Sequence, residues 1–68
     1  MNEVVNLLNL VPGEKLALSD GSTVEVVSNP RDGMWVFARY LSSPADPSQE
    51  GSEEMIFAQQ IVALLESS

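Results

Sequence analysis

Apolar and polar residues alternate along the chain between Lys15 and Leu41, with the two-residue period of β-strands that bury one face. Two Asp-Gly dipeptides, Asp20-Gly21 and Asp32-Gly33, divide this stretch into three runs. Asp-Gly between alternating apolar residues favours a hairpin, because glycine readily takes the positive φ that a tight turn needs. The pattern predicts a three-strand antiparallel meander over residues 14–41.

The first hairpin can close in two ways, and these place opposite sets of side chains on the buried face. A two-residue loop at Asp20-Gly21 puts leucines opposite polar residues. A three-residue loop pairs Leu16 with Val24 and Lys15 with Glu25 instead. Because a slip of one residue turns every side chain to the other face, the burial of the leucines favours the three-residue loop.

The second turn is expected over Asn29–Gly33, since Asn29 and Pro30 suit the first two positions of a turn. This loop length places Val26 opposite Val36, and it continues the apolar face of the first hairpin. The predicted buried face consists of Leu16, Leu18, Val24, Val26, Val36, Ala38 and Tyr40.

The opposite face of the meander is unusually apolar for a face that should meet water. It carries the only tryptophan, Trp35, and one of the two phenylalanines, Phe37, together with Val27 and Arg39. Aromatic residues and arginine are enriched at binding hot spots. We therefore predict that Trp35, Phe37, Arg39 and Val27 form a partner-binding surface. The alternative is that sheet curvature or the N-terminal segment covers the two aromatic side chains.

The segments around the meander are less regular. Residues 1–10 begin a helical stripe formed by Val4, Leu7, Leu8 and Val11, which favours a short helix over an extended arm. Residues 42–53 contain two prolines and no apolar residue larger than alanine, which indicates a flexible acidic loop. Residues 54–65 are expected to form a closing strand and turn, although 57–65 fit a helix as well as a strand.

The order of these segments is similar to that of a known small fold. A long meander from Lys15 to Leu41 precedes a fourth strand over Glu54–Ala58, a single tight turn near Ala58-Gln59-Gln60, and a short last strand over Ile61–Leu65. This order resembles the small SH3-like β-barrels found in many uncharacterised bacterial proteins. The resemblance covers roughly residues 11–65 and implies a mainly β barrel or half-barrel of about five antiparallel strands. It implies no activity, and the acidic, aromatic groove motif of SH3 domains that bind proline-rich peptides is not visible. A length of 68 residues leaves room for one domain only, over residues 1–68.

Size and charge narrow the classes of partner. A chain of 68 residues buries a small core, so a partner protein or self-association into a homo-oligomer is expected to help stabilise it. Three basic residues face ten acidic ones, for a net charge of -7. Nucleic-acid binding draws most of its affinity from cationic side chains, so nucleic acid is an unlikely partner, and an anionic membrane surface is disfavoured for the same reason.

The residue types also disfavour catalysis and cofactor binding. The chain contains no histidine and no cysteine, so it lacks the usual base for a nucleophilic serine and the usual zinc ligands. The loop that begins at Asp46 resembles a calcium loop in its first six positions, but its twelfth position is Phe57 instead of a glutamate. We predict no catalytic residue, no metal site and no cofactor.

These observations favour a small non-catalytic protein–protein interaction module or accessory subunit. The alternative is a single-stranded nucleic-acid binder that stacks bases on Trp35 and Phe37, which a steep salt dependence of binding would reveal. No apolar run reaches the ~20 residues of a membrane-spanning helix, and the first residues, Met1-Asn2-Glu3, lack the positive charge of a signal peptide. A cytoplasmic location is therefore expected.

Overall fold

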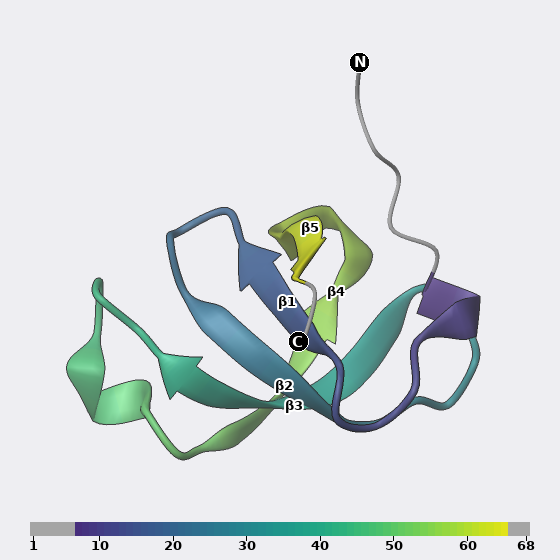
Figure 1. The fold of residues 1–68 in the computed structure, drawn as a ribbon, viewed down its shortest axis with the longest axis horizontal. Helices are drawn as coiled ribbons and strands as arrows, with labels where there is room; N and C mark the ends of the chain where they lie inside the picture. The colour runs from purple at the N-terminus through teal and green to yellow at the C-terminus, as the bar shows by residue number, and fades with distance from the viewer. Residues whose placement is uncertain (1–6, 66–68) are drawn as a thin grey trace.

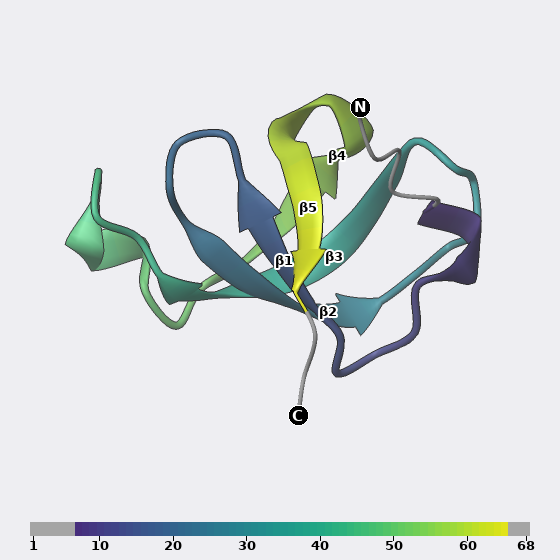
Figure 2. The same ribbon diagram turned by 45° about the horizontal axis from the view of Figure 1, so that its top comes forward.

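The computed structural model describes residues 7–65 as one strongly curved antiparallel sheet of five strands (Figure 1). The strands lie in the order β4-β3-β2-β1-β5, and among the described residues β4 and β5 do not pair with each other, so the sheet is an open half-barrel (Figure 2). The predicted mainly β fold is confirmed. The strands are β1 (Lys15–Leu18), β2 (Thr23–Ser28), β3 (Trp35–Ser42), β4 (Glu53–Phe57) and β5 (Ile61–Leu65), and the single 3-10 turns are η1 (Leu7–Asn9), η2 (Pro47–Gln49) and η3 (Ala58–Gln60).

The first hairpin closes with the three-residue loop that burial favoured. Leu16 lies opposite Val24 and Lys15 opposite Glu25. The Leu18 N–H donates to the Ser22 carbonyl (2.9 Å), and the Gly21 N–H donates to the Leu18 carbonyl (3.0 Å). Gly21 has a φ of 89°, a conformation that glycine adopts at little cost. The predicted register of β1 and β2 is therefore confirmed.

The register of the second hairpin differs from the prediction by two residues. Val26 lies opposite Ala38 instead of Val36, and a bulge interrupts β2 between Val26 and Ser28. Because side chains alternate with a period of two, a shift of two residues leaves the side chains of β2 up to Val26 on their expected face, whereas the bulge places Ser28 opposite Phe37 of the other face. The predicted partners were therefore wrong while the predicted buried face was right.

Asn29 explains why the second loop is longer than predicted. Its Nδ2 donates to the carbonyl oxygens of Leu7 (2.5 Å) and Leu10 (2.9 Å), and its Oδ1 accepts from the Arg31 N–H (2.8 Å). Arg31 takes a φ of 65° and Gly33 a φ of 81°. The loop is thus shaped by contacts with the N-terminal segment, which local turn preferences do not include.

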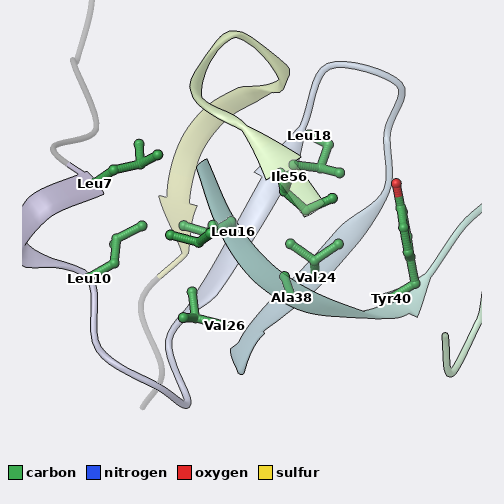
Figure 3. Packing of buried hydrophobic residues seen from close by; sticks show 10 residues of the cluster. Leu7, Leu10, Leu16, Leu18, Val24, Val26, Ala38, Tyr40 and Ile56 are labelled. Carbon is green, nitrogen blue, oxygen red and sulfur yellow. The ribbon is translucent and has the colours of Figure 1, made fainter. Parts of the chain in front are cut away.

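The core lies on the concave side of the sheet. All seven residues of the predicted buried face are buried, and the half-buried Ile61 packs against them. Burial raises the pKa of Tyr40, and the charges of Asp20 and Glu54 act in the same direction. Figure 3 shows the core side chains converging from the strands and from the N-terminal segment, which contributes Leu7 and Leu10, while β4 contributes Ile56.

The N-terminal stripe differs from the prediction where the structure describes it. Leu7 and Leu10 are buried, whereas Leu8 and Val11 are exposed. The chain forms the single turn η1, in which the Leu10 N–H donates to the Leu7 carbonyl (3.2 Å). Of the expected stripe of Val4, Leu7, Leu8 and Val11, Leu7 is buried as predicted, whereas Leu8 and Val11 were wrong, because this turn directs Leu10 to the core beside Leu7. Residues 1–6 of the predicted helix lie outside the described residues.

The C-terminal part follows the predicted strand, turn and strand. β4 begins one residue earlier than expected, and residues 61–65, which also fitted a helix, form β5 against β1. The Ser19 N–H donates to the Gln60 carbonyl (2.8 Å), which fixes η3 beside the first hairpin. The loop expected over 42–53 is shorter in the structure, because Ser42 belongs to β3 and Glu53 to β4; residues 43–52 contain η2, and the mobility of this loop stays a prediction. Among residues 7–65, no helix is long and apolar enough to cross a membrane.

Candidate protein-interaction surface

β3 brings three of the four predicted partner-binding residues to one face. Trp35, Phe37 and Arg39 alternate along the strand with buried residues, so they share the convex outer face of the sheet. Phe37 is 39% exposed, and Trp35 is half-buried. The fourth residue, Val27, is half-buried at the bulge of β2, next to Ser28, which lies opposite Phe37. The aromatic side chains are therefore only partly covered.

Two further apolar residues join this face from β4. Phe57 lies directly opposite Trp35, and Met55 lies directly opposite Phe37. Their side chains are 41% and 43% exposed. The rings of Trp35 and Phe37 meet edge to face, with centroids 5.1 Å apart and an interplanar angle of 85°. We call these four residues, Trp35, Phe37, Met55 and Phe57, the outer patch.

The sequence contained a signal for the two residues of β4 that the prediction missed. Met55 and Phe57 are two apart, on either side of Ile56, which is buried. In a strand, this spacing puts Met55 and Phe57 together on the face opposite Ile56. Met55-Ile56-Phe57 is a run of three apolar residues, so the sequence shows no alternation of apolar and polar residues there. Which of the two faces is buried becomes clear only when the partner strand is known.

A row of charges of alternating sign borders the outer patch. The strand registers place Lys15 opposite Glu25, Glu25 opposite Arg39, and Arg39 opposite Glu53, so the row crosses four strands. The Arg39 Nη2 lies 3.0 Å from the Glu53 Oε2, with side chains that are 46% and 49% exposed. Exposed pairs of this kind contribute about 0.2–1 kcal/mol. Arg39 therefore marks the border of the outer patch and is held in place by β4.

A hollow of about 400 Å³ adjoins the patch where β3 begins and β4 ends, lined by Gly33, Met34, Phe57, Ala58 and Gln59. Its lining is mainly apolar and has no charged side chain. Ligand sites usually combine an apolar lining with several converging polar groups. The composition of this hollow suits an apolar side chain of a partner better than a polar small molecule.

Asp46, the first residue of the calcium-like loop, bonds within its own turn. Its Oδ1 accepts from the Ser48 hydroxyl (2.6 Å) and the Ser48 N–H (3.3 Å), and its Oδ2 accepts from the Gln49 Nε2 (3.3 Å). These hydrogen bonds, first among them that of the Ser48 hydroxyl, lower the pKa of Asp46. In the part of the chain that the structure describes, no three acidic side chains are grouped as metal ligands.

The chain matches no protein-family model, no curated protein and no solved structure.

Proposed function

We propose that this chain is a small non-catalytic protein–protein interaction module, or an accessory subunit, that binds a partner protein through the outer patch. One observation carries the proposal. Four large apolar side chains gather on the solvent side of β3 and β4, although the core on the concave side already holds these strands. Contiguous exposed apolar surface of this kind is characteristic of interaction sites.

The composition of the patch supports binding in energetic terms. A large apolar side chain that passes from full exposure to full burial contributes roughly 1.5–3 kcal/mol. Trp35, Phe37, Met55 and Phe57 are each only partly exposed, so each contributes a fraction of that value. Arg39 and Val27 border the patch and complete the predicted surface. Paired aromatic residues beside an arginine have the composition of a binding hot spot.

The SH3-like fold, the class of partner and the cytoplasmic location belong to the same proposal. The order of the five strands, with η3 directly before β5, supports an SH3-like half-barrel. A fold of this kind hosts many unrelated functions, so the functional proposal rests on the patch and not on the fold. The net charge of -7 favours a protein partner over nucleic acid, and we place the module in the cytoplasm.

Site-specific photo-crosslinking in cells tests this proposal, because it captures a bound partner protein of any identity. A benzophenone amino acid replaces Phe37 in one variant and Val62 of β5, which is 54% exposed, in the control variant. We expect a discrete crosslinked protein at position 37 that is absent at position 62. Equal labelling at both positions, crosslinks to nucleic acid, or no crosslink at position 37 would overturn the proposal.

A further inference from the structure

β4 forms one edge of the sheet, and no other strand within residues 7–65 pairs with its outer side. The Ala58 N–H donates to the Met34 carbonyl (2.9 Å), and the Tyr40 N–H donates to the Ser52 carbonyl (2.9 Å). Hydrogen-bonded and non-hydrogen-bonded pairs alternate along an antiparallel ladder. Ile56 and Glu54 therefore bond to β3, whereas Glu53, Met55 and Phe57 turn their main-chain groups toward the open edge.

The residues with outward main-chain groups also carry the side chains of the outer face. Met55 and Phe57 belong to the outer patch, and Glu53 belongs to the charged row. The Phe57 N–H already donates to the Gln60 Oε1 (2.9 Å), so Met55 and Glu53 are the two residues that offer both donor and acceptor. A strand added beside β4 would bond to these groups and extend the outer patch at the same time.

The charge along β4 indicates the chemistry of such a strand. Glu53 and Glu54 occupy one half of β4 and are both exposed, while Met55, Ile56 and Phe57 occupy the other half. Charges on an edge strand disfavour pairing with like-charged strands, and a second copy of this chain also carries a net charge of -7. A strand with basic residues at one end and apolar residues at the other is complementary to β4.

We propose that the edge of β4 accepts an extended segment of the partner protein as an additional antiparallel strand, with the pattern apolar–x–apolar–basic–basic. Antiparallel pairing is favoured because it is the more stable of the two geometries. The first and third positions lie opposite Phe57 and Met55 and enlarge the outer patch. The fourth and fifth positions lie opposite Glu54 and Glu53. This inference rests on the proposed function and names the partner segment that would use the same surface.

A capped synthetic peptide, acetyl-Ser-Val-Thr-Val-Lys-Lys-Ser-amide, is the probe, and its first valine occupies the first position of the pattern. Titration into the isotope-labelled chain is expected to give saturable amide shifts that centre on Glu53 and Met55. The same peptide with glutamate in place of both lysines should not bind. A peptide with the reversed sequence would fit only a parallel strand, and we expect it to bind more weakly.

N-methylation of the peptide separates strand addition from side-chain binding. The N–H at the third position points at the Met55 carbonyl, whereas the N–H groups at the second and fourth positions point away from β4. Methylation at the third position should weaken binding by about tenfold or more, since it removes a main-chain hydrogen bond and places a methyl group in the interface. Methylation at the second or fourth position should leave affinity nearly unchanged. Equal effects at all three positions would overturn strand addition.

Met55→Pro and Met55→Ala form the matched pair on the protein side. Both remove the side chain from the outer patch, and only Met55→Pro also removes the outward N–H, which the β3 ladder does not use. We expect Met55→Pro to bind the peptide about tenfold more weakly than Met55→Ala. If Met55→Pro does not fold, the methylated peptides still decide the question.

The possible failures are distinguishable. Saturable peptide binding that is insensitive to the position of the methyl group overturns the added strand but leaves the outer patch as a binding surface. A peptide that does not bind at millimolar concentration overturns this inference, and crosslinking at position 37 still tests the proposed function separately. A dimer in sedimentation equilibrium that Met55→Pro converts to a monomer would show that a second copy occupies the edge, which also overturns the inference.

Discussion

Ile56 and Met55 are neighbours in β4 with side chains of similar size, but they lie on opposite faces of the sheet. Ile56 is 0% exposed and packs in the core, whereas Met55 is 43% exposed and lies in the outer patch. Residues of β3 alternate in the same way, with Val36 inside and Phe37 outside. The concave face therefore accounts for stability, and the apolar residues on the convex face require another explanation.

Truncation of these two neighbours should show the largest contrast. Ile56→Ala creates a cavity in the core and should lower the free energy of unfolding by about 2–5 kcal/mol, which is most of the stability of a domain this small. Met55→Ala should lower it by about 1 kcal/mol or less, because the side chain is already half in water. Urea unfolding of both variants measures the difference, and equal losses would show that the outer patch is part of the core.

Asn29 holds the N-terminal segment over the concave face, so its loss should also lower stability. Asn29→Ala removes hydrogen bonds to the Leu7 and Leu10 carbonyls and from the Arg31 N–H. Since each of these three bonds contributes about 0.5–1.5 kcal/mol, we expect a loss of about 1.5–4.5 kcal/mol. Asn29→Asp keeps the acceptor for the Arg31 N–H, but it places a carboxylate oxygen against the Leu7 and Leu10 carbonyl oxygens, so it should be no more stable than Asn29→Ala. Chemical denaturation measures both variants. An Asn29→Asp variant as stable as the wild type would refute the role of Asn29 in holding the N-terminal segment.

The ion pair at the border of the outer patch should have a smaller effect. Arg39→Gln and Glu53→Gln, alone and combined, form a double-mutant cycle. We expect a coupling free energy of about 0.2–1 kcal/mol, because both side chains are about half exposed. The coupling should decline at high salt, where charges are screened. A coupling that is independent of salt would contradict this interpretation.

Asp20 should give the smallest effect, which appears only in acid. A hydrogen bond from the Ser22 N–H (2.9 Å) lowers the pKa of Asp20 from its ordinary value of 3.8. A lowered pKa in the folded chain stabilises the fold above the unfolded pKa, and the benefit is lost as the pH falls through the folded pKa. The stability advantage of the wild type over Asp20→Asn should therefore shrink below about pH 4. Thermal unfolding at several pH values measures it, and a constant difference across pH would contradict the assignment.

The sequence was sufficient to predict the face on which most residues of the meander lie. The alternation from Leu16 to Tyr40 and the Asp-Gly turn at Gly21 are local signals, and burial selects one register of the first hairpin. The second register was out of reach, because Asn29 bonds to carbonyls of Leu7 and Leu10, which are about twenty residues away in the chain. Such a long-range contact changes the length of a loop, and the local turn preferences of the loop residues do not indicate it.

The outer surface was predictable only in part. Trp35, Phe37 and Arg39 follow from the period of β3, because three polar or aromatic residues alternate with buried ones. Met55 and Phe57 of β4 join this surface because of the register between β3 and β4, and tertiary packing sets that register. The buried residue of a short apolar run such as Met55-Ile56-Phe57 cannot be chosen from periodicity alone.

Two measurements on Phe37→Ala, its stability and its affinity for the protein that crosslinks at position 37, decide whether the outer patch serves recognition. If the outer patch serves recognition, the variant should stay folded, with a free energy of unfolding within about 1 kcal/mol of the wild type. Its affinity for that partner should fall by about 2 kcal/mol, or roughly thirtyfold. A variant that loses about 3 kcal/mol of stability, while its folded fraction binds the partner as tightly as the wild type, would contradict the claim and assign Phe37 to the core.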